Sequence, residues 1–367
     1  MIIKNGNVFQ DNKVFVKRDL YIEKGIIVEN AEQVTDHSEI NASDLLVLPG
    51  LIDIHSHGAV GHDFSDGNPK GLEEILIYEY AHGITSYCPT SMTIDRKELE
   101  NLFERMGNFR EGYGMAHVAG INMEGPFLDV SKKGAHKQEN IMAPDVNFFR
   151  RCNQACGKHI CLVTLAPDVE GAMEFIRELH NEVSISLGHT GADYDTAKAA
   201  LEAGANHVTH LFNAMMPLGH RAPGLIGAAA EDENCMAELI CDGIHVHESM
   251  VRAAFKLFPG RIVLISDSMR AAGMEDGTYD LGGQQVTVNG KLATLSDGTI
   301  AGSATNLYDC MRTAVSFGIP MEEAIAAATI NPARSIGIYD RVGSLTPGKQ
   351  ADVILMDKNL ELVKVIR

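Results

Sequence analysis

The chain has few features of secreted, membrane or zinc-knuckle proteins. Its seven cysteines include no Cys-x-x-Cys pair, and most lie in apolar segments such as the one around Cys241. An odd number of scattered cysteines excludes a disulfide framework and favours reduced, packed thiols. No hydrophobic run approaches the length that crosses a bilayer, and the first residues lack the regions of a signal peptide. We therefore expect a cytoplasmic protein.

Positive charge is also scarce. The 367 residues contain 31 Lys and Arg against 49 Asp and Glu, a formal net charge of −18. This balance disfavours nucleic acid and anionic membranes as partners, because the long-range attraction has the wrong sign. A small anionic substrate remains open, but local donors would have to hold it. The length favours one large α/β domain with a smaller appendage.

The two chain ends have the same strand-like pattern. Residues 1–50 consist of short apolar segments separated by Asn-Gly and Lys-Gly turns, and the segment from Gly343 to Ile366 looks alike. Such turns are typical of hairpins, and each piece is too small to hold a core alone. We expect residues 1–50 and 338–367 to pair into one small β-sandwich domain beside a barrel at 51–337.

Between the ends, strand-like apolar runs alternate with helical ones. The predicted strands are Leu51–His57, Ile84–Thr90, His117–Glu124, Ile160–Ala166, Val183–His189, His207–His210, Ala237–Asp242 and Arg261–Asp267. The predicted helices are Leu72–Ala81, Arg96–Met106, Gly171–His180, Tyr194–Ala203, Glu248–Phe258, Ala304–Phe317 and Met321–Ile330. Eight repeats of strand and helix predict an α/β fold of the (β/α)8 TIM-barrel type. The competing doubly wound sheet is less favoured, because no Gly-x-Gly-x-x-Gly follows the first strand.

Polar residues of metal-ligand type end most of these strands. They are His55, His57, Glu124, His189, His210 and Asp267. The carboxyl ends of barrel strands form one face, where barrel enzymes keep their chemistry. Two histidines at i and i+2 on an extended chain point to the same side, so both reach one ion. A lone His-x-His could equally be two buried, hydrogen-bonded histidines, but the repeated pattern predicts a metal site.

The segment at about 270–302 interrupts the alternation. It is rich in Asp-Gly, Gly-Gly and Asn-Gly turns around Gln284–Val288. This pattern predicts a β-hairpin insertion over the mouth of the barrel, with glycine-rich ends that would let it move as a lid. A surface ornament without function is the alternative.

Several longer motifs carry a family resemblance. They are Pro49-Gly-Leu-Ile-Asp-Ile-His-Ser-His57, Asn122-Met-Glu-Gly-Pro-Phe127, Lys133-Gly-Ala-His136, Leu187-Gly-His-Thr190, Thr209-His-Leu-Phe-Asn-Ala-Met215, Asp242-Gly-Ile-His245 and Ser266-Asp267. With them the chain resembles the amidohydrolase superfamily, and within it the N-acetylglucosamine-6-phosphate deacetylases, over nearly its whole length.

The resemblance implies a set of metal ligands. Glu124, His189 and His210 would hold the principal divalent ion, and His55 with His57 would complete a second position. Some members carry Gln and Asn at these two places and use a single metal. One or two ions of zinc or iron suit such nitrogen and oxygen donors. In dihydroorotases and hydantoinases a modified Lys takes the place of the Glu, which argues against those activities.

The resemblance also assigns the chemistry. The metal would lower the pKa of water, and Asp267 would accept the proton and pass it to the departing amine. His136 would hydrogen-bond the carbonyl oxygen as it becomes an oxyanion. Without the resemblance, His136 would be a loop residue on the surface.

The substrate phosphate would be held at the other end of the site. The resemblance places the backbone amides of Asn213 and Ala214 and the side chain of His245 on the phosphate. An Arg matching Arg221 would come from the neighbouring subunit, which implies a homodimer. Without the resemblance, Arg221 in its glycine-bounded loop would be a solvated charge. The other histidines, including His207, are expected to be structural or surface residues.

The expected function is therefore removal of acetate from N-acetyl-D-glucosamine 6-phosphate, a step of amino-sugar catabolism that yields D-glucosamine 6-phosphate. The galactosamine epimer is an alternative substrate, since it differs at one hydroxyl. A non-catalytic assembly protein with this fold is a third reading. Such proteins lose the ligand set, and this chain retains it.

Overall fold

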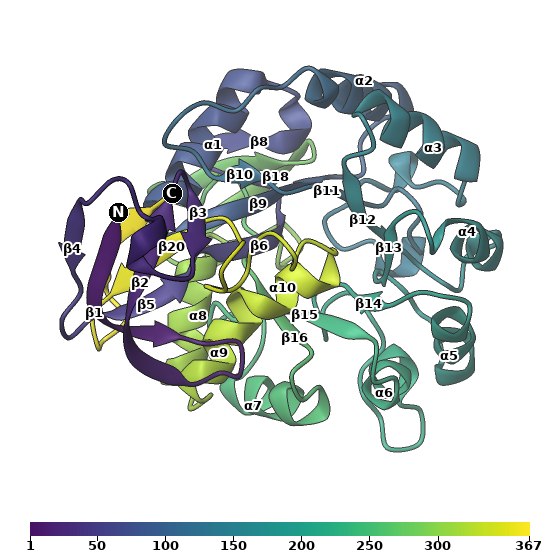
Figure 1. Cartoon of the computed structure of the whole chain (residues 1–367). Helices are drawn as coiled ribbons and strands as arrows, with labels where there is room; N and C mark the ends of the chain where they lie inside the picture. The colour runs from purple at the N-terminus through teal and green to yellow at the C-terminus, as the bar shows by residue number, and fades with distance from the viewer.

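The computed structural model describes residues 1–367 and places a barrel of parallel strands at its centre (Figure 1). The strands are β6 (Leu51–Ser56), β9 (Ile84–Ser91), β10 (His117–Val118), β11 (Ile121–Glu124), β12 (Ile160–Leu165), β13 (Ser184–Leu187), β14 (His207–Val208), β15 (Met236–Ile240) and β16 (Ile262–Ile265). Apart from the two-residue β10, they run in the order β6, β9, β11, β12, β13, β14, β15, β16. The predicted (β/α)8 fold is confirmed.

The ring closes at the carboxyl ends of its first and last strands. No strand ladder joins β16 to β6. Instead, the Asp267 N–H donates to the His55 carbonyl at 2.9 Å, and the His57 N–H donates to the Ser268 carbonyl at 2.8 Å. The closure therefore lies at the segments that carry three of the predicted site residues.

Ten α-helices follow the strands, and Figure 1 shows α2 to α7 along the outside of the barrel. Their bounds are α1 (Pro69–Ala81), α2 (Arg96–Gly107), α3 (Val146–Ala155), α4 (Ala172–Leu179), α5 (Tyr194–Glu202), α6 (Gly224–Glu231), α7 (Glu248–Leu257), α8 (Leu307–Ser316), α9 (Met321–Ala328) and α10 (Ile330–Ser335). Side chains of Asp95, Asp145 and Asp193 cap α2, α3 and α5 by accepting backbone N–H groups.

Three of these helices, α3, α6 and α10, were not predicted. Helix α6 consists of small and apolar residues without a side-chain N-cap, so it has neither a polar face nor a start signal. Helix α10 contains Pro332 and follows α9 after one residue, Thr329, so the sequence does not show it as a separate helix.

Several predicted strands are shorter in the structure. His189, His210 and Asp267 lie just past the ends of β13, β14 and β16, with φ of 48°, 29° and 48°. Residues other than glycine rarely adopt this left-handed conformation, and where they do they often belong to functional sites. The predicted strand His117–Glu124 is divided into β10 and β11.

Both chain ends contribute to a second sheet. Its strands are β1 (Ile2–Phe9), β2 (Phe15–Glu23), β3 (Ile26–Val28), β4 (Glu39–Asn41), β5 (Leu46–Pro49), β20 (Val353–Met356) and β21 (Leu362–Ile366). Strand β20 pairs antiparallel with β5, and the N- and C-termini lie on the same side of the molecule in Figure 1. Ile3, Val8 and Val353 belong to its separate buried core. The exact boundaries near residues 50 and 338 stay predictions.

The insertion is a three-stranded antiparallel sheet of β17 (Gly277–Leu281), β18 (Gln284–Asn289) and β19 (Leu292–Thr294). Leu281, Val286 and Val288 form a buried cluster with Met92 and Met269 of the barrel. The insertion is therefore packed onto the barrel through its own apolar core.

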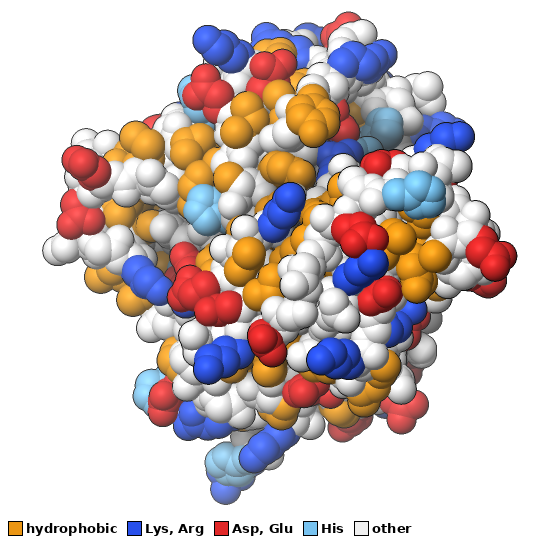
Figure 2. All heavy atoms as spheres, turned by 60° about the vertical axis from the view of Figure 1, so that its left-hand side comes forward, with side chains coloured by type: hydrophobic (Ala, Val, Ile, Leu, Met, Phe, Trp, Pro, Cys, Tyr) orange, Lys and Arg blue, Asp and Glu red, His pale blue; other side chains and the backbone are white.

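The remaining elements are short. They are the ribbon of β7 (Gly58–Ala59) and β8 (His62–Asp63) and the 3-10 helices η1 (Ala31–Gln33), η2 (Phe64–Asp66), η3 (Val130–Lys132) and η4 (Gln138–Asn140). The face in Figure 2 mixes acidic, basic and apolar side chains without a block of one sign. No helix is both long and apolar enough to cross a membrane.

Candidate metal centre

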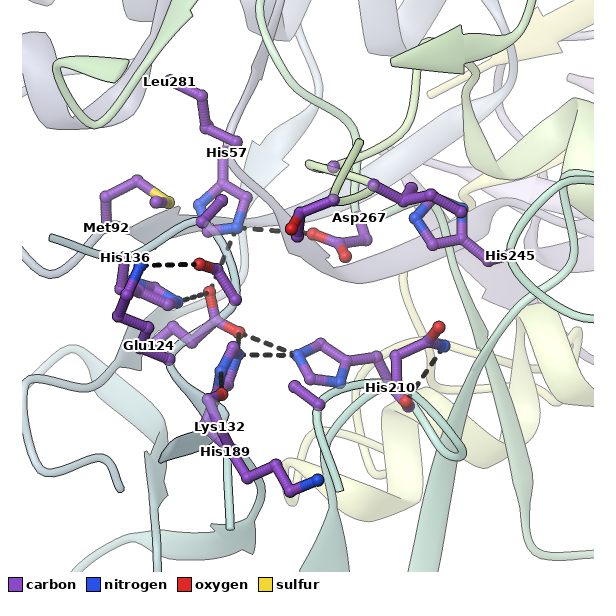
Figure 3. Close-up of a pocket in the computed structure, with 18 of the residues that line it drawn as sticks. His57, Met92, Glu124, Lys132, His136, His189, His210, His245, Asp267 and Leu281 are labelled. Atoms are coloured by element: carbon purple, nitrogen blue, oxygen red, sulfur yellow. Dashed lines mark hydrogen bonds and ion pairs between the residues drawn. The ribbon is translucent and has the colours of Figure 1, made fainter. Parts of the chain in front are cut away.

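A cavity of about 560 Å³ opens at the carboxyl ends of the barrel strands. Six residues predicted for the metal site and the chemistry line it: His57, Glu124, His136, His189, His210 and Asp267 (Figure 3). His55 does not line the cavity, because it is fully buried beneath it. The structure thus brings together side chains that are up to 212 positions apart in the sequence.

Glu124, at the end of β11, is the centre of this cluster. Its Oε1 atom lies 3.1 Å from Nε2 of both His189 and His210. Its Oε2 atom lies 3.1 Å from Nε2 of His57 and 3.4 Å from Nε2 of His136. Nε2 of His55 lies 3.5 Å from Oε1, so one carboxylate faces five imidazoles.

In three of the histidines, a hydrogen bond holds the second ring nitrogen, Nδ1. Nδ1 of His57 lies 3.1 Å from the Thr90 carbonyl, and Nδ1 of His189 lies 2.8 Å from the Lys132 carbonyl. Nδ1 of His55 lies 2.8 Å from a Glu238 carboxylate oxygen. These oxygens accept hydrogen bonds, so each Nδ1 carries a proton and each Nε2 faces the cluster.

The cluster fits a divalent cation. Nε2 of His189 and Nε2 of His210 are 3.0 Å apart, a separation at which two lone pairs repel unless a proton or a cation lies between them. Nε2 of His55 and Nδ1 of His210 are buried without a hydrogen-bond partner. Two triads have ligand atoms within 4.8 Å of one another: His55, His57 and Glu124, and Glu124, His136 and His189. Nitrogen and oxygen donors in such sets suit zinc and iron.

Opposite charges stabilise the same cluster. Burial alone would lower the pKa of His57, but Asp267 and Glu124 raise it to about 10. Burial would likewise raise the pKa of Asp267, but the hydrogen bond from His57 and the charges of His55 and His57 lower it to about 2. Burial dominates at His189 and lowers its pKa to about 4. The site is therefore organised to balance positive charge against two carboxylates.

Two further side chains point into the cavity with a defined hydrogen-bonding role. Asp267 Oδ1 lies 3.4 Å from Nε2 of His57, and the Asp267 side chain is 11% exposed. The backbone N–H of Thr93 donates to Nδ1 of His136 at 3.3 Å. His136 therefore carries its proton on Nε2, which faces Glu124. The cavity holds one proton acceptor and one N–H donor beside the metal cluster.

The residues predicted to bind phosphate lie only partly as expected. Asn213, Ala214 and His245 line the same cavity. The Asn213 N–H donates to the His210 carbonyl at 2.9 Å, whereas the Ala214 N–H makes no hydrogen bond within the chain. His245 is oriented by Asp242, whose Oδ2 lies 2.7 Å from Nδ1 of the ring. The Ala214 amide is a free donor here, and Nε2 of His245 makes no hydrogen bond within the chain.

Arg221 lies away from the cavity. It is exposed in the loop before α6, and it does not line the pocket. Gly219 and Ala222 close this loop by reciprocal backbone hydrogen bonds of 3.2 Å, so Arg221 is at the tip of a tight turn. The loop projects from the barrel below α6 in Figure 1.

Some lining residues were not predicted from the sequence. Lys132 and Lys133 add positive charge to the cavity, and Met92 and Leu281 give it an apolar wall. The two lysines directly before Gly134-Ala135-His136 could have indicated this positive charge. A role for Glu238 was also not predicted, although the sequence shows it as a charged residue within an apolar predicted strand.

A (β/α)8 barrel with imidazoles and carboxylates gathered at the carboxyl ends of its strands is typical of metal-dependent hydrolases. Residues 46–366 match the amidohydrolase family. The chain belongs to this family.

Named relatives show which members of this family the chain is similar to. The N-acetylglucosamine-6-phosphate deacetylase of Bacillus subtilis (strain 168) is 39% identical over 381 aligned residues, covering 100% of this chain and 95% of the relative. The N-acetylgalactosamine-6-phosphate deacetylase of Escherichia coli O157:H7 is 35% identical, covering 87% of this chain and 86% of the relative. A mutant N-acetyl-D-glucosamine-6-phosphate deacetylase of Mycobacterium smegmatis, solved with N-acetyl-D-glucosamine-6-phosphate, matches with a TM-score of 0.92 and 31% identity, covering 100% of this chain and 97% of that one.

Proposed function

We propose that this protein is a metal-dependent amide hydrolase that removes acetate from N-acetyl-D-glucosamine 6-phosphate and yields D-glucosamine 6-phosphate. The observation that carries the proposal is the convergence of five imidazoles on the Glu124 carboxylate beside Asp267, at the mouth of a barrel. The similarity to deacetylases with this substrate in their names supports the choice of substrate. A place in amino-sugar catabolism and a cytoplasmic location belong to the same proposal.

Five side chains would hold the metal. Glu124, His189 and His210 form the principal position, and His55 with His57 form the second, with Glu124 between them. One or two ions of zinc or iron suit these donors. When bound, the ion supplies Lewis acidity, which lowers the pKa of water and polarises an amide carbonyl.

Asp267 acts as the general base and then as the general acid. An amide carbonyl resists attack by neutral water, so a group must accept the proton during attack. The low pKa of Asp267, about 2, keeps the carboxylate ionised, which is the form that can accept a proton. The amine leaves only when protonated, and Asp267 is placed at the cavity to return the proton to it.

His136 stabilises the oxyanion. As water attacks, the carbonyl oxygen gains negative charge and needs a preorganised donor. The Thr93 amide fixes the proton of His136 on Nε2, and this N–H faces Glu124 in the cavity that both residues line. The hydrogen bond to such an oxygen strengthens only as charge develops, so it favours the transition state over the substrate.

The sugar phosphate binds at the opposite end of the cavity. The Ala214 amide offers a free donor there, and His245, which Asp242 orients through Nδ1, lines the cavity together with Asn213. Lys132 and Lys133 add local positive charge to a chain whose net charge is −18. We place Arg221 of a second subunit on the same phosphate, which makes the active unit a homodimer.

The test is acetate release from both 6-phosphorylated epimers, measured after chelation and after refilling with zinc or iron. We expect release from the glucosamine epimer that depends on added metal. Faster release from the galactosamine epimer would transfer the activity to that alternative, which the Escherichia coli O157:H7 relative supports. Absence of release from either epimer by metal-loaded protein would favour a non-catalytic role, against which the intact ligand set argues.

A further inference from the structure

We propose that Glu238 is a positioning residue of the metal site, which fixes the His55 ring and the chain segment that carries His210. The inference rests on the proposed function, because it concerns the ion of that site. Glu238 lies on β15 and is fully buried. Its side chain enters the barrel interior beneath the cavity and does not line it.

A single oxygen of Glu238 serves both segments. Oε2 accepts the Nδ1 proton of His55 at 2.8 Å and the backbone N–H of His210 at 3.1 Å. The backbone carbonyl of Glu238 also accepts the Leu211 N–H at 2.8 Å. Glu238 thereby ties the end of β6 to the left-handed turn after β14, and these two segments supply ligands to the two metal positions.

A packing role does not explain this carboxylate. Burying a charged group is costly unless its partners compensate, and Oε1 of Glu238 has no hydrogen-bond partner. Nδ1 of His207 lies 3.7 Å from Oε1, and that ring nitrogen is hydrogen-bonded to Ser186 instead. An apolar side chain would fill this position at lower cost. The benefit of the carboxylate lies in the two hydrogen bonds to Oε2.

The bond to His55 has a direct consequence for metal binding. With its proton held on Nδ1, the ring presents Nε2 to Glu124 at 3.5 Å and to Asp267 at 3.6 Å. Nε2 itself has no hydrogen-bond partner. Without the acceptor on Glu238, the proton could move to Nε2 and block the lone pair. Carboxylate partners of this kind fix the tautomer and orientation of metal-binding histidines.

Zinc binding to the apoprotein tests the proposal. Glu238→Leu removes the acceptor, and we expect its zinc affinity, measured by competition with a chromophoric chelator, to fall by about 10- to 100-fold. Glu238→Gln keeps an acceptor oxygen at the same reach and should recover most of the affinity. Glu238→Asp keeps the charge but is one methylene shorter, so it should bind zinc less well than Glu238→Gln.

A matched control is available in Glu79, another fully buried carboxylate, whose two oxygens have no hydrogen-bond partner. Glu79→Gln should bind zinc as the wild type does. Nitrogen NMR of the histidine-labelled apoprotein gives an independent readout. The Nδ1–H signal that His55→Gln abolishes should persist in Glu238→Gln and vanish in Glu238→Leu.

The outcomes separate this inference from the proposed function. A folded Glu238→Leu variant with wild-type zinc affinity and stoichiometry would overturn the positioning role. If Glu238→Leu does not fold, wild-type affinity in Glu238→Asp would overturn it equally. A wild-type apoprotein that binds no zinc or iron would instead refute the metal site, and with it the proposed function.

Discussion

The two ends of the cavity are built in different ways. At the metal end, the side chains of His55, His57 and Glu124 are at most 3% exposed, and three imidazoles are fixed through their second nitrogen. At the phosphate end, Asn213 and Ala214 are half-buried loop residues, and Arg221 is exposed at the tip of a turn. All the proposed metal ligands come from one chain, whereas the proposed phosphate site is assembled from loops.

This difference follows from the fold. Parallel strands deliver their last residues to a common rim, so barrel geometry alone brings the metal ligands together. Loops have no such shared register, and their conformation depends on what packs against them. Substitutions at the metal end should therefore act on metal content and turnover, and substitutions at the phosphate end should act on substrate affinity.

The largest effect is expected at Glu124. Glu124→Ala removes the carboxylate that five imidazoles face, so the protein should lose its metal and acetate release should fall to background. Elemental analysis of the purified protein measures the metal. His62→Ala is a matched control, because His62 pairs with Glu74 at the surface. Full metal occupancy in Glu124→Ala would contradict the ligand assignment, and His189→Ala provides a second, independent test of it.

The next effect separates chemistry from metal binding. Asp267→Asn keeps the shape of the side chain but cannot accept a proton. We expect kcat to fall by about 100- to 10,000-fold, the usual contribution of general acid–base catalysis, while metal content stays near that of the wild type. Wild-type turnover in this variant would remove Asp267 from the mechanism. Loss of the metal would make Asp267 a ligand instead of a base.

The metal end is also the part of the site that the sequence predicts well. His55, Glu124, His189 and Asp267 terminate apolar runs, and the ends of such runs must meet once the runs form a parallel barrel. What the pattern does not contain is the left-handed turn at His189 and Asp267, because the short-range signal for such a turn is usually glycine or asparagine. The predicted strands were too long for this reason.

Features that depend on packing between distant segments could not be predicted. Glu238 looked like one residue of an apolar strand, and its partners His55 and His210 are 183 and 28 positions away. Helix α6 is built of small residues without polar periodicity. The three-stranded insertion was predicted as a hairpin, because β19 has only three residues, which is too few to show alternation.

A smaller effect is expected at His136, which comes from a loop but reaches the metal end. His136→Ala removes one oxyanion donor and should lower kcat by about 100- to 1000-fold. The Michaelis constant should change little, because the bond to the oxygen strengthens only in the transition state. His136 also lies in one of the triads that fit a cation. Metal loss in His136→Ala, found by elemental analysis, would make it a ligand and contradict the assigned role.

The smallest effect, and the most informative about the phosphate end, is expected at Arg221. A hydrogen bond to a charged group contributes about 1.5 to 3 kcal/mol, so Arg221→Ala should raise KM for the 6-phosphorylated sugar by about 10- to 100-fold. KM for the unphosphorylated sugar should not change. Arg341→Ala, at another exposed arginine that lies outside the cavity, is the control. An equal effect on both sugars would count against a phosphate role.

A mixed dimer shows from which subunit Arg221 acts. If Arg221 crosses the interface, a heterodimer of Arg221→Ala and Asp267→Asn chains contains one intact site, because the Asp267→Asn chain supplies its Arg221 to the partner whose Asp267 is unchanged. Such a heterodimer, purified through two different tags, should regain a low KM and about half of the wild-type kcat per dimer. If Arg221 serves its own chain, the one site that retains Asp267 also lacks Arg221. The high KM of Arg221→Ala would then persist in the heterodimer, and the phosphate end would be complete within one chain like the metal end.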